Sequence, residues 1–197
     1  MKKKIIFTVI ALVLTLVLLA ACGGGYKSTL QQITKLLKVD YSEITLNVTT
    51  TTNDITLNGN YTLTFEDDRT IIDYSYDKLN DLSLDGNNAD SYLTKVRGRA
   101  VVENGVIVEG NTAEQLPEEV NYGGISFKQA FFANYKMTGA TFEADVRVPK
   151  GFTGNTSLEC SNMHVTVMYS KVALSKIAIT YVSENGSNVS MTYLFTK

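Results

Sequence analysis

The sequence predicts an α+β fold that is mostly antiparallel β: a curved sheet or half-barrel of about 8–9 strands, packed by two short helices. Three observations support this prediction. Apolar and polar residues alternate with a period of two through most of the chain after Tyr41. Turn-forming pairs such as Asn104-Gly105 and Asn185-Gly186 separate the alternating runs. Only two stretches have apolar residues at helical spacing, so the helices are few and short.

The first helix is predicted over residues 29–38. Ser28 and Gln31 form a capping box, with a Ser at the N-cap and a Gln at the third helical position. The apolar residues that follow at helical spacing are Leu30, Ile33 and Leu37. A second capping box, Ser126 to Gln129, predicts the second helix. Its expected buried stripe consists of Phe127, Ala130, Phe131 and Tyr135, with Gly139 near its end.

Strands are expected on both sides of the second helix. Before it, the alternating runs are Tyr41 to Thr52, Ile55 to Phe65, Thr70 to Tyr76, Leu93 to Glu103 and Val106 to Val108. After it, they are residues 141–148, 163–169, 172–183 and 187–196. In the first two runs Thr and Asn occupy the polar positions, which is typical of a sheet with one face on the core and one in water.

The N-terminus has the pattern of a secretory signal. Lys2, Lys3 and Lys4 precede an apolar run that ends in small residues before Cys22. The alternative is a transmembrane anchor, for which this apolar run is short. We predict a signal peptide over 1–21, a lipidated tether over 22–27 and a single antiparallel-sheet domain over 28–197. The tether would span at most about 20 Å.

Leu19-Ala20-Ala21-Cys22 resembles the lipobox of bacterial lipoproteins. The resemblance implies cleavage before Cys22 and a diacylglyceryl group on its sulfur. The protein would then be lipid-anchored at the extracytoplasmic face of the cell membrane, in the outer leaflet of the plasma membrane if the host is Gram-positive. Without its three N-terminal lysines the chain carries 15 basic and 20 acidic side chains, a charge of −5. An acidic body leaves attachment to the acyl chains.

Composition limits the classes of function. The whole chain has 197 residues, one His, two Cys, no Trp and a net charge of −2. We expect no nucleic-acid partner, because phosphate binding needs clustered Lys and Arg. We expect no zinc or haem site, because these sites draw on several His or Cys ligands. Neither a cofactor nor a metal is predicted.

The chain offers one pair of residues for nucleophilic catalysis, Cys160 and His164. They share a parity in the expected strand, but four residues separate them by about 13 Å, beyond hydrogen-bond reach. We therefore predict that the protein is not an enzyme and that His164 lies on the sheet surface. Cys160, left alone once Cys22 is lipidated, would either pair between molecules or be a buried thiol, and burial is favoured.

An acidic segment partly matches a calcium loop. Asp81, Ser83 and Asp85 place oxygen donors at positions one, three and five, and Gly86 follows. Position twelve is Tyr92 rather than a bidentate Glu, so the segment is interpreted as a solvated acidic loop.

The order of these elements resembles the lipoprotein-carrier half-barrels, the LolA-like and LppX/LprG-like proteins, and also Gram-positive-type lipoproteins. The likeness covers most of residues 28–196 and implies a curved sheet whose apolar face, covered by helices, holds acyl chains. The residues expected there are Leu46, Leu57, Leu63, Phe127, Phe131, Phe142, Val146, Val165, Ile177 and Ile179. A filled core made of the same side chains is equally allowed.

Two classes of function therefore remain open. One is a lipoprotein that binds or carries a lipid or other hydrophobic ligand at the membrane. The other is a non-enzymatic cell-envelope interaction or adhesion module that recognises a protein or wall polymer through its Thr/Asn-rich face or acidic loop. A cavity in the core favours the first class, and a solid core with an exposed apolar or aromatic patch favours the second.

Overall fold

The computed structural model describes residues 25–79, 93–104, 106–110, 120 and 122–197. Its strands are β1 (Glu43–Thr52), β2 (Ile55–Phe65), β3 (Arg69–Leu79), β4 (Leu93–Glu103), β5 (Val106–Glu109), β6 (Phe132–Thr138), β7 (Thr141–Val146), β8 (Cys160–Tyr169), β9 (Leu174–Ser183) and β10 (Asn188–Thr196). The described helical segments are an N-terminal α-helix over residues 25–36, α2 (Pro149–Thr153), and the 3-10 turns η3 (Tyr122–Gly124) and η4 (Gln129–Phe131).

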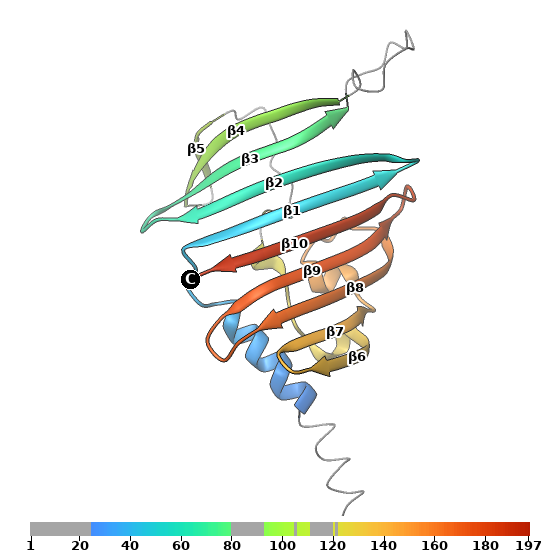
Figure 1. The fold of residues 1–197 in the computed structure, drawn as a ribbon. Helices are drawn as coiled ribbons and strands as arrows, with labels where there is room; N and C mark the ends of the chain where they lie inside the picture. The colour runs from blue at the N-terminus through green and yellow to red at the C-terminus, as the bar shows by residue number, and fades with distance from the viewer. Residues whose placement is uncertain (1–24, 80–92, 105, 111–119, 121) are drawn as a thin grey trace, which may run out of the picture.

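All ten strands belong to one antiparallel sheet with the order β5-β4-β3-β2-β1-β10-β9-β8-β7-β6. Strands that are neighbours in sequence pair with each other, except β5 and β6. In addition β1 pairs with β10, which joins the two halves of the chain (Figure 1). The predicted fold class, a mostly antiparallel sheet with two helices, is confirmed. The sheet is open, and β5 and β6 are its edges.

The inner face of the sheet is apolar and buried, as the alternating pattern predicts. Ile44 and Leu46 of β1 are fully buried, and one hydrophobic cluster extends from them across the neighbouring strands. Close packing needs glycine at one inner-face position. A Cβ at Gly98 would lie 2.2 Å from the hydroxyl oxygen of Tyr74, which sits opposite it on β3.

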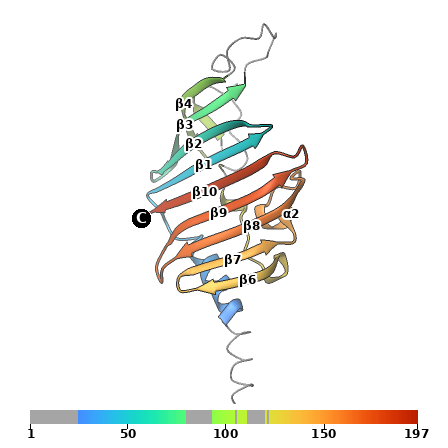
Figure 2. The ribbon, with the colours of Figure 1, turned by 45° about the vertical axis from the view of Figure 1, so that its right-hand side comes forward.

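The N-terminal helix covers the inner face on the β6–β10 half of the sheet (Figures 1 and 2). Its buried side chains are Tyr26, Leu30, Ile33 and Leu36. Hydrogen bonds fix its position, because Thr29 donates to the sulfur of Met137 in β6 and Gln32 donates to the carbonyl of Ser170 beyond β8. Amphipathic packing of this kind, rather than intrinsic propensity, supplies most of the stability of a short helix.

The second helix is not where the sequence analysis placed it. Residues 129–131 form only a 3-10 turn, and β6 follows where Tyr135 was expected on a helix. β6 pairs with β7, and a bulge between Ala133 and Lys136 interrupts its alternation. Because of this bulge, with Asn134 at φ 47°, β6 lacks the alternation of period two that marks a strand. The aromatic residues Phe127, Phe131 and Tyr135 are instead spaced as on a helix, which explains the wrong prediction.

α2 occupies a connection for which no helix was expected. Pro149 stands at the start, where its missing N–H costs nothing, and Gly154 ends the helix in the left-handed conformation at φ 76°. Its Phe152 is fully buried in the same cluster as Phe127, Phe132 and Phe142. The centroid of the Phe152 ring lies 5.5 Å from that of Phe127 and 5.5 Å from that of Phe132.

The N-terminal helix also starts earlier than predicted. It already includes residue 25, so Ser28 is inside it and donates to the carbonyl of Gly25 rather than capping its start. Tyr26 is 4% exposed and stacks on Tyr135 with a centroid distance of 3.7 Å. The packed body therefore includes residues 25–27, which the sequence analysis assigned to the tether.

Candidate functional site

The apolar residues predicted to hold a ligand lie mostly in the core. Eight of the ten are buried: Leu46, Leu63, Phe127, Phe142, Val146, Val165, Ile177 and Ile179. Phe131 is partly buried against the same cluster, and Leu57 is half-exposed toward the end of the β1–β2 hairpin. The sheet brings these side chains together from both halves of the chain. Phe127 also lines a surface hollow.

This hollow lies between the N-terminal helix and the segment before η4, and its volume is about 610 Å³. Leu30 and Phe127, both buried, contribute its apolar floor, and the aliphatic parts of longer side chains add to it. Its lining residues are Lys27, Leu30, Gln31, Thr34, Lys35, Phe127, Lys128 and Gln129. The volume is in the range of small-molecule sites, which are typically apolar with a few polar groups.

The polar rim of the hollow was missed by the sequence analysis. Lys27, Gln31, Thr34 and Lys35 follow one another at intervals that place them on one face of a helix, beside the buried stripe. This signal was available in the sequence. Lys128 comes from a distant segment, so its place beside them depends on the tertiary fold. A hollow with an apolar floor and a cationic rim matches an amphiphilic molecule.

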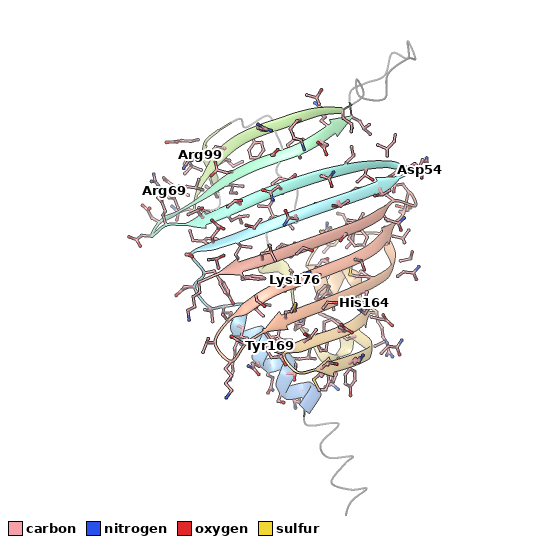
Figure 3. The ribbon with its side chains drawn as sticks, in the orientation of Figure 1. Asp54, Arg69, Arg99, His164, Tyr169 and Lys176 are labelled. Carbon is pink, nitrogen blue, oxygen red and sulfur yellow. The ribbon has the colours of Figure 1, made fainter. Side chains whose placement is uncertain are left out.

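His164 lies on the outer face of β8, as predicted (Figure 3). Its Nδ1 is 3.0 Å from Oδ1 of Asp145, and Oδ2 of Asp145 accepts a hydrogen bond of 2.8 Å from Asn134. The bond to His164, then that to Asn134, lower the pKa of Asp145. Both side chains of the pair are about half-exposed. The sequence analysis missed the pair, although both residues are polar positions of adjacent strands.

Cys160 does not share a face with His164. The pairing of β8 with β9 shifts between Ser161 and His164, and Asn162 adopts φ 54° at this bulge. The extra residue reverses the parity, so Cys160 pairs with Ser183 and packs against the core while His164 faces solvent. Burial, then the charge of Glu159, raises the pKa of the Cys160 thiol. The expectation that Cys160 and His164 lie on the same face of the strand was wrong. The thiol and the imidazole are nevertheless separated, because they lie on opposite faces.

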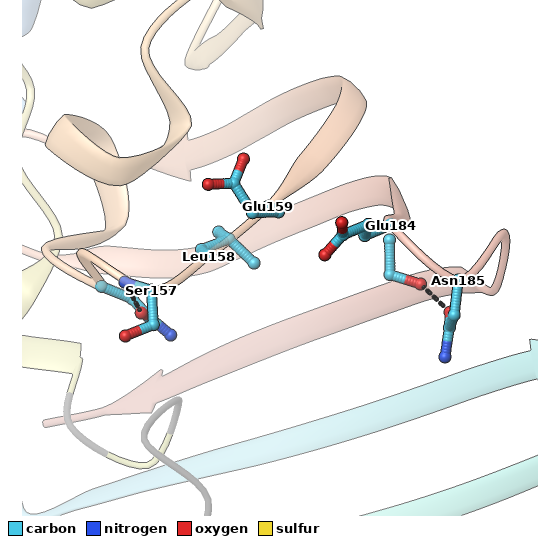
Figure 4. Close-up of a pocket in the computed structure, with 7 residues that line it drawn as sticks. Ser157, Leu158, Glu159, Glu184 and Asn185 are labelled. Atoms are coloured by element: carbon cyan, nitrogen blue, oxygen red, sulfur yellow. Dashed lines mark hydrogen bonds between the residues drawn. The ribbon is translucent and has the colours of Figure 1, made fainter.

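A second hollow, of about 590 Å³, lies where the chain enters β8 beside the β9–β10 turn (Figure 4). Its polar groups are engaged in shaping the turns. Oδ1 of Asn185 accepts hydrogen bonds from the hydroxyls of Ser183 and Ser187, and Oδ1 of Asn155 accepts one from the backbone N–H of Ser157. Glu159 pairs with Lys150. These interactions explain the residues as turn structure rather than as ligand donors.

The outer face of the sheet carries aligned rows of polar side chains. One row crosses eight strands from β7 to β4 and is polar except at Ala178. It consists of Glu143, Thr166, Ala178, Thr192, Asn47, Asn60, Ser75 and Arg97. Within this row Asn60 donates to Asn47 at 2.6 Å, and in the next row Thr49 donates to Asn58 at 3.2 Å. The predicted Thr/Asn-rich face is therefore present and centred on β1, β2 and β10.

Several predicted features lie outside the described residues: the signal peptide over 1–21, Cys22 and the acidic loop from Asp81 to Tyr92. In the described part of the chain, no helix is long and apolar enough to cross a membrane. Among the same residues, no three His, Cys, Asp or Glu side chains gather closely enough to hold a metal ion.

Comparison with known proteins identifies no family for the chain. No protein-family model matches the sequence, and no curated protein matches it. Among solved structures, the chain is similar to a DUF1329 family protein from Desulfovibrio piger. The TM-score is 0.27 with 9% sequence identity, over 85% of this chain and 90% of that one. A similarity at this level establishes neither a shared fold nor a shared function.

Proposed function

We propose that the protein is a non-enzymatic lipoprotein, anchored through Cys22 at the extracytoplasmic face of the membrane, that binds a lipid or other hydrophobic ligand. The observation that carries the proposal is the position of the hollow over Leu30 and Phe127. It lies on the helix that already includes residue 25, only a few residues after Cys22. An anchored chain would hold this hollow beside the bilayer, where a lipid reaches it without crossing much water.

The anchor is tested by replacing Cys22 with Ser. The wild-type chain should incorporate radiolabelled palmitate and fractionate with membranes, and C22S should lose the label. Membrane fractionation of wild type without any label would show that the apolar run from Ile5 to Leu19 is an ordinary transmembrane helix.

The ligand site is tested by filling the hollow. Gln31 is exposed and lines it, so Q31W should occupy the space without disturbing the core. The full chain, purified from membranes in mild detergent, is titrated with a fluorescent fatty acid. We expect Q31W to weaken uptake at least about tenfold, because its ring competes for the apolar floor. N47W, which places the same ring on the outer face, serves as the control. Equal uptake by Q31W and wild type would overturn the hollow as the site.

The polar rows of the outer face favour a second candidate, the cell-envelope interaction module. A flat face of Thr, Asn and Ser offers many hydrogen-bond donors and acceptors to a wall polymer. Co-sedimentation with insoluble cell wall tests this function. Binding that N47R abolishes would support it, and binding that N47R leaves unchanged would exclude this face.

A further inference from the structure

The N-terminal helix carries lysines and no acidic side chain, in a protein that is acidic overall. Residues 25–38 contain Lys27, Lys35 and Lys38 and no Asp or Glu, whereas residues 22–197 carry five more acidic than basic side chains. The lysines at 27 and 35 are exposed and lie on the helix face that lines the hollow. The N-terminal helix, which follows Cys22 by only a few residues, thus carries an excess of positive charge.

The tertiary fold adds a third cation to this surface. Lys128, exposed, lines the same hollow, and its Nζ lies 5.6 Å from the centroid of the Phe131 ring. Among the described residues, no carboxylate lines the hollow and none forms an ion pair with any of the three lysines. Three ammonium groups around one apolar floor, without anions of their own, are complementary to an anionic amphiphile.

We propose that Lys27, Lys35 and Lys128 bind the anionic headgroup of a phospholipid in the bilayer to which the chain is anchored. The proposal rests on the proposed function, because the anchor at Cys22 is what keeps the helix at the membrane. Lys27 is five positions after Cys22, a distance of at most about 18 Å, so Lys27 stays within reach of the headgroups. Leu30 and Phe127 would contact the apolar part of the lipid just below its phosphate.

The test uses the full chain, purified from membranes and reconstituted into lipid nanodiscs. One set of discs contains only phosphatidylcholine, and the other also contains phosphatidylglycerol. Each lysine is acetylated with a limiting reagent, and its rate is measured by peptide mass spectrometry. We expect the rates of Lys27, Lys35 and Lys128 to fall about fivefold in anionic discs, because a lysine near an anionic surface gains roughly fivefold in affinity. Added salt should restore the rates.

Lys78 and Lys176 provide internal controls in the same molecule, because Lys78 is at the end of β3 and Lys176 is on the outer face of β9 (Figure 3). Their rates should not depend on the lipid. The variant K27Q/K35Q/K128Q should lose retained phosphatidylglycerol in native mass spectrometry, and K176Q should keep it.

Equal acetylation of the three lysines in neutral and anionic discs would overturn the headgroup site. Protection in neutral discs by inorganic phosphate alone would show a free-phosphate site and contradict the bilayer as the source. The proposed function fails by different results, namely a chain without the diacylglyceryl mass in the same sample or unchanged fatty-acid uptake by Q31W.

Discussion

At the residue scale, two buried tyrosines of the N-terminal segment differ in how their hydroxyls are satisfied. The hydroxyl of Tyr41 donates to the carbonyl of Leu36 at 2.8 Å and accepts from the N–H of Leu174 at 2.9 Å. It thereby ties the end of the helix to β9. The hydroxyl of Tyr26 is buried without a hydrogen-bond partner among the described residues. Burial raises the pKa of both phenols, so both remain neutral at physiological pH.

Removing the hydroxyl should therefore change the free energy of unfolding differently at Tyr41 and at Tyr26. Y41F leaves the Leu174 N–H and Leu36 carbonyl without their partner and should lower the free energy of unfolding by about 2 kcal/mol. Y26F removes an unsatisfied polar group and should leave the free energy of unfolding unchanged or raise it by up to about 1 kcal/mol. Urea denaturation measures both. A clear destabilisation by Y26F would show that its hydroxyl has a partner, a bound water or ligand.

Asp77 is a carboxylate whose contribution depends on pH. Its Oδ1 is 2.7 Å from Nζ of Lys95, and its Oδ2 accepts the backbone N–H of Asn58 at 2.8 Å. These bonds lower the pKa of Asp77, and the bond to Lys95 has the larger effect. A lowered folded-state pKa gives stability that is present above the unfolded value of about 3.9 and is lost as the pH falls through the folded value.

D77N should therefore be less stable than wild type by about 1 kcal/mol at neutral pH. The difference in melting temperature should shrink as the pH is lowered below about 4. D73N is the matched control, because Asp73 lies 3.8 Å from Arg99 with both side chains more than half-exposed, and it should change little. A D77N difference that persists unchanged into acid would contradict the assigned interactions.

At the element scale, the N-terminal helix contributes through its buried stripe. Ile33 is fully buried in the core cluster. I33A should lower the free energy of unfolding by about 3 kcal/mol and the melting temperature by about 10 °C. K35A, two residues away on the exposed face, should change stability by less than about 0.5 kcal/mol. Equal effects of the two substitutions would show that the helix does not pack against the sheet as described.

The strands were predictable where alternation is uninterrupted. β1, β2, β4, β9 and β10 lie within a few residues of their predicted ranges, because each has one face on the core and one in water. The bulges at Asn134 and Asn162 are where prediction failed. Each inserts a residue that the partner strand must accept, so it depends on pairing between strands and leaves no local periodic signal. One concealed β6, and the other separated Cys160 from His164.

At the scale of the whole molecule, the core could be predicted better than the candidate site. The inner-face residues follow from parity alone, whereas the hollow needs Lys128 and Phe127 to meet the N-terminal helix across a hundred residues. The lysine spacing on the helix was visible in the sequence, but the loop that completes the rim was assigned to a helix. Local sequence patterns therefore predict the strands and the N-terminal helix, whereas the hollow can be found only from the tertiary fold.

The whole molecule should fold without metal or disulfide. Cys160 is the one free thiol of the described residues, and burial raises its pKa and lowers its reactivity. Thermal melts with and without chelator, and with and without reductant, should coincide. A rise of several degrees on adding calcium would contradict this expectation and identify the acidic loop at Asp81 as a site.

Native mass spectrometry of the full protein, released gently from membranes, tests the central claim most directly. We predict a chain that starts at Cys22, carries the mass of a diacylglyceryl group, and appears in a second charge series with one additional noncovalent lipid. Q31W should keep the covalent mass and lose the second series. A chain that still begins at Met1, or a lipidated chain that never carries an additional lipid, would contradict the account.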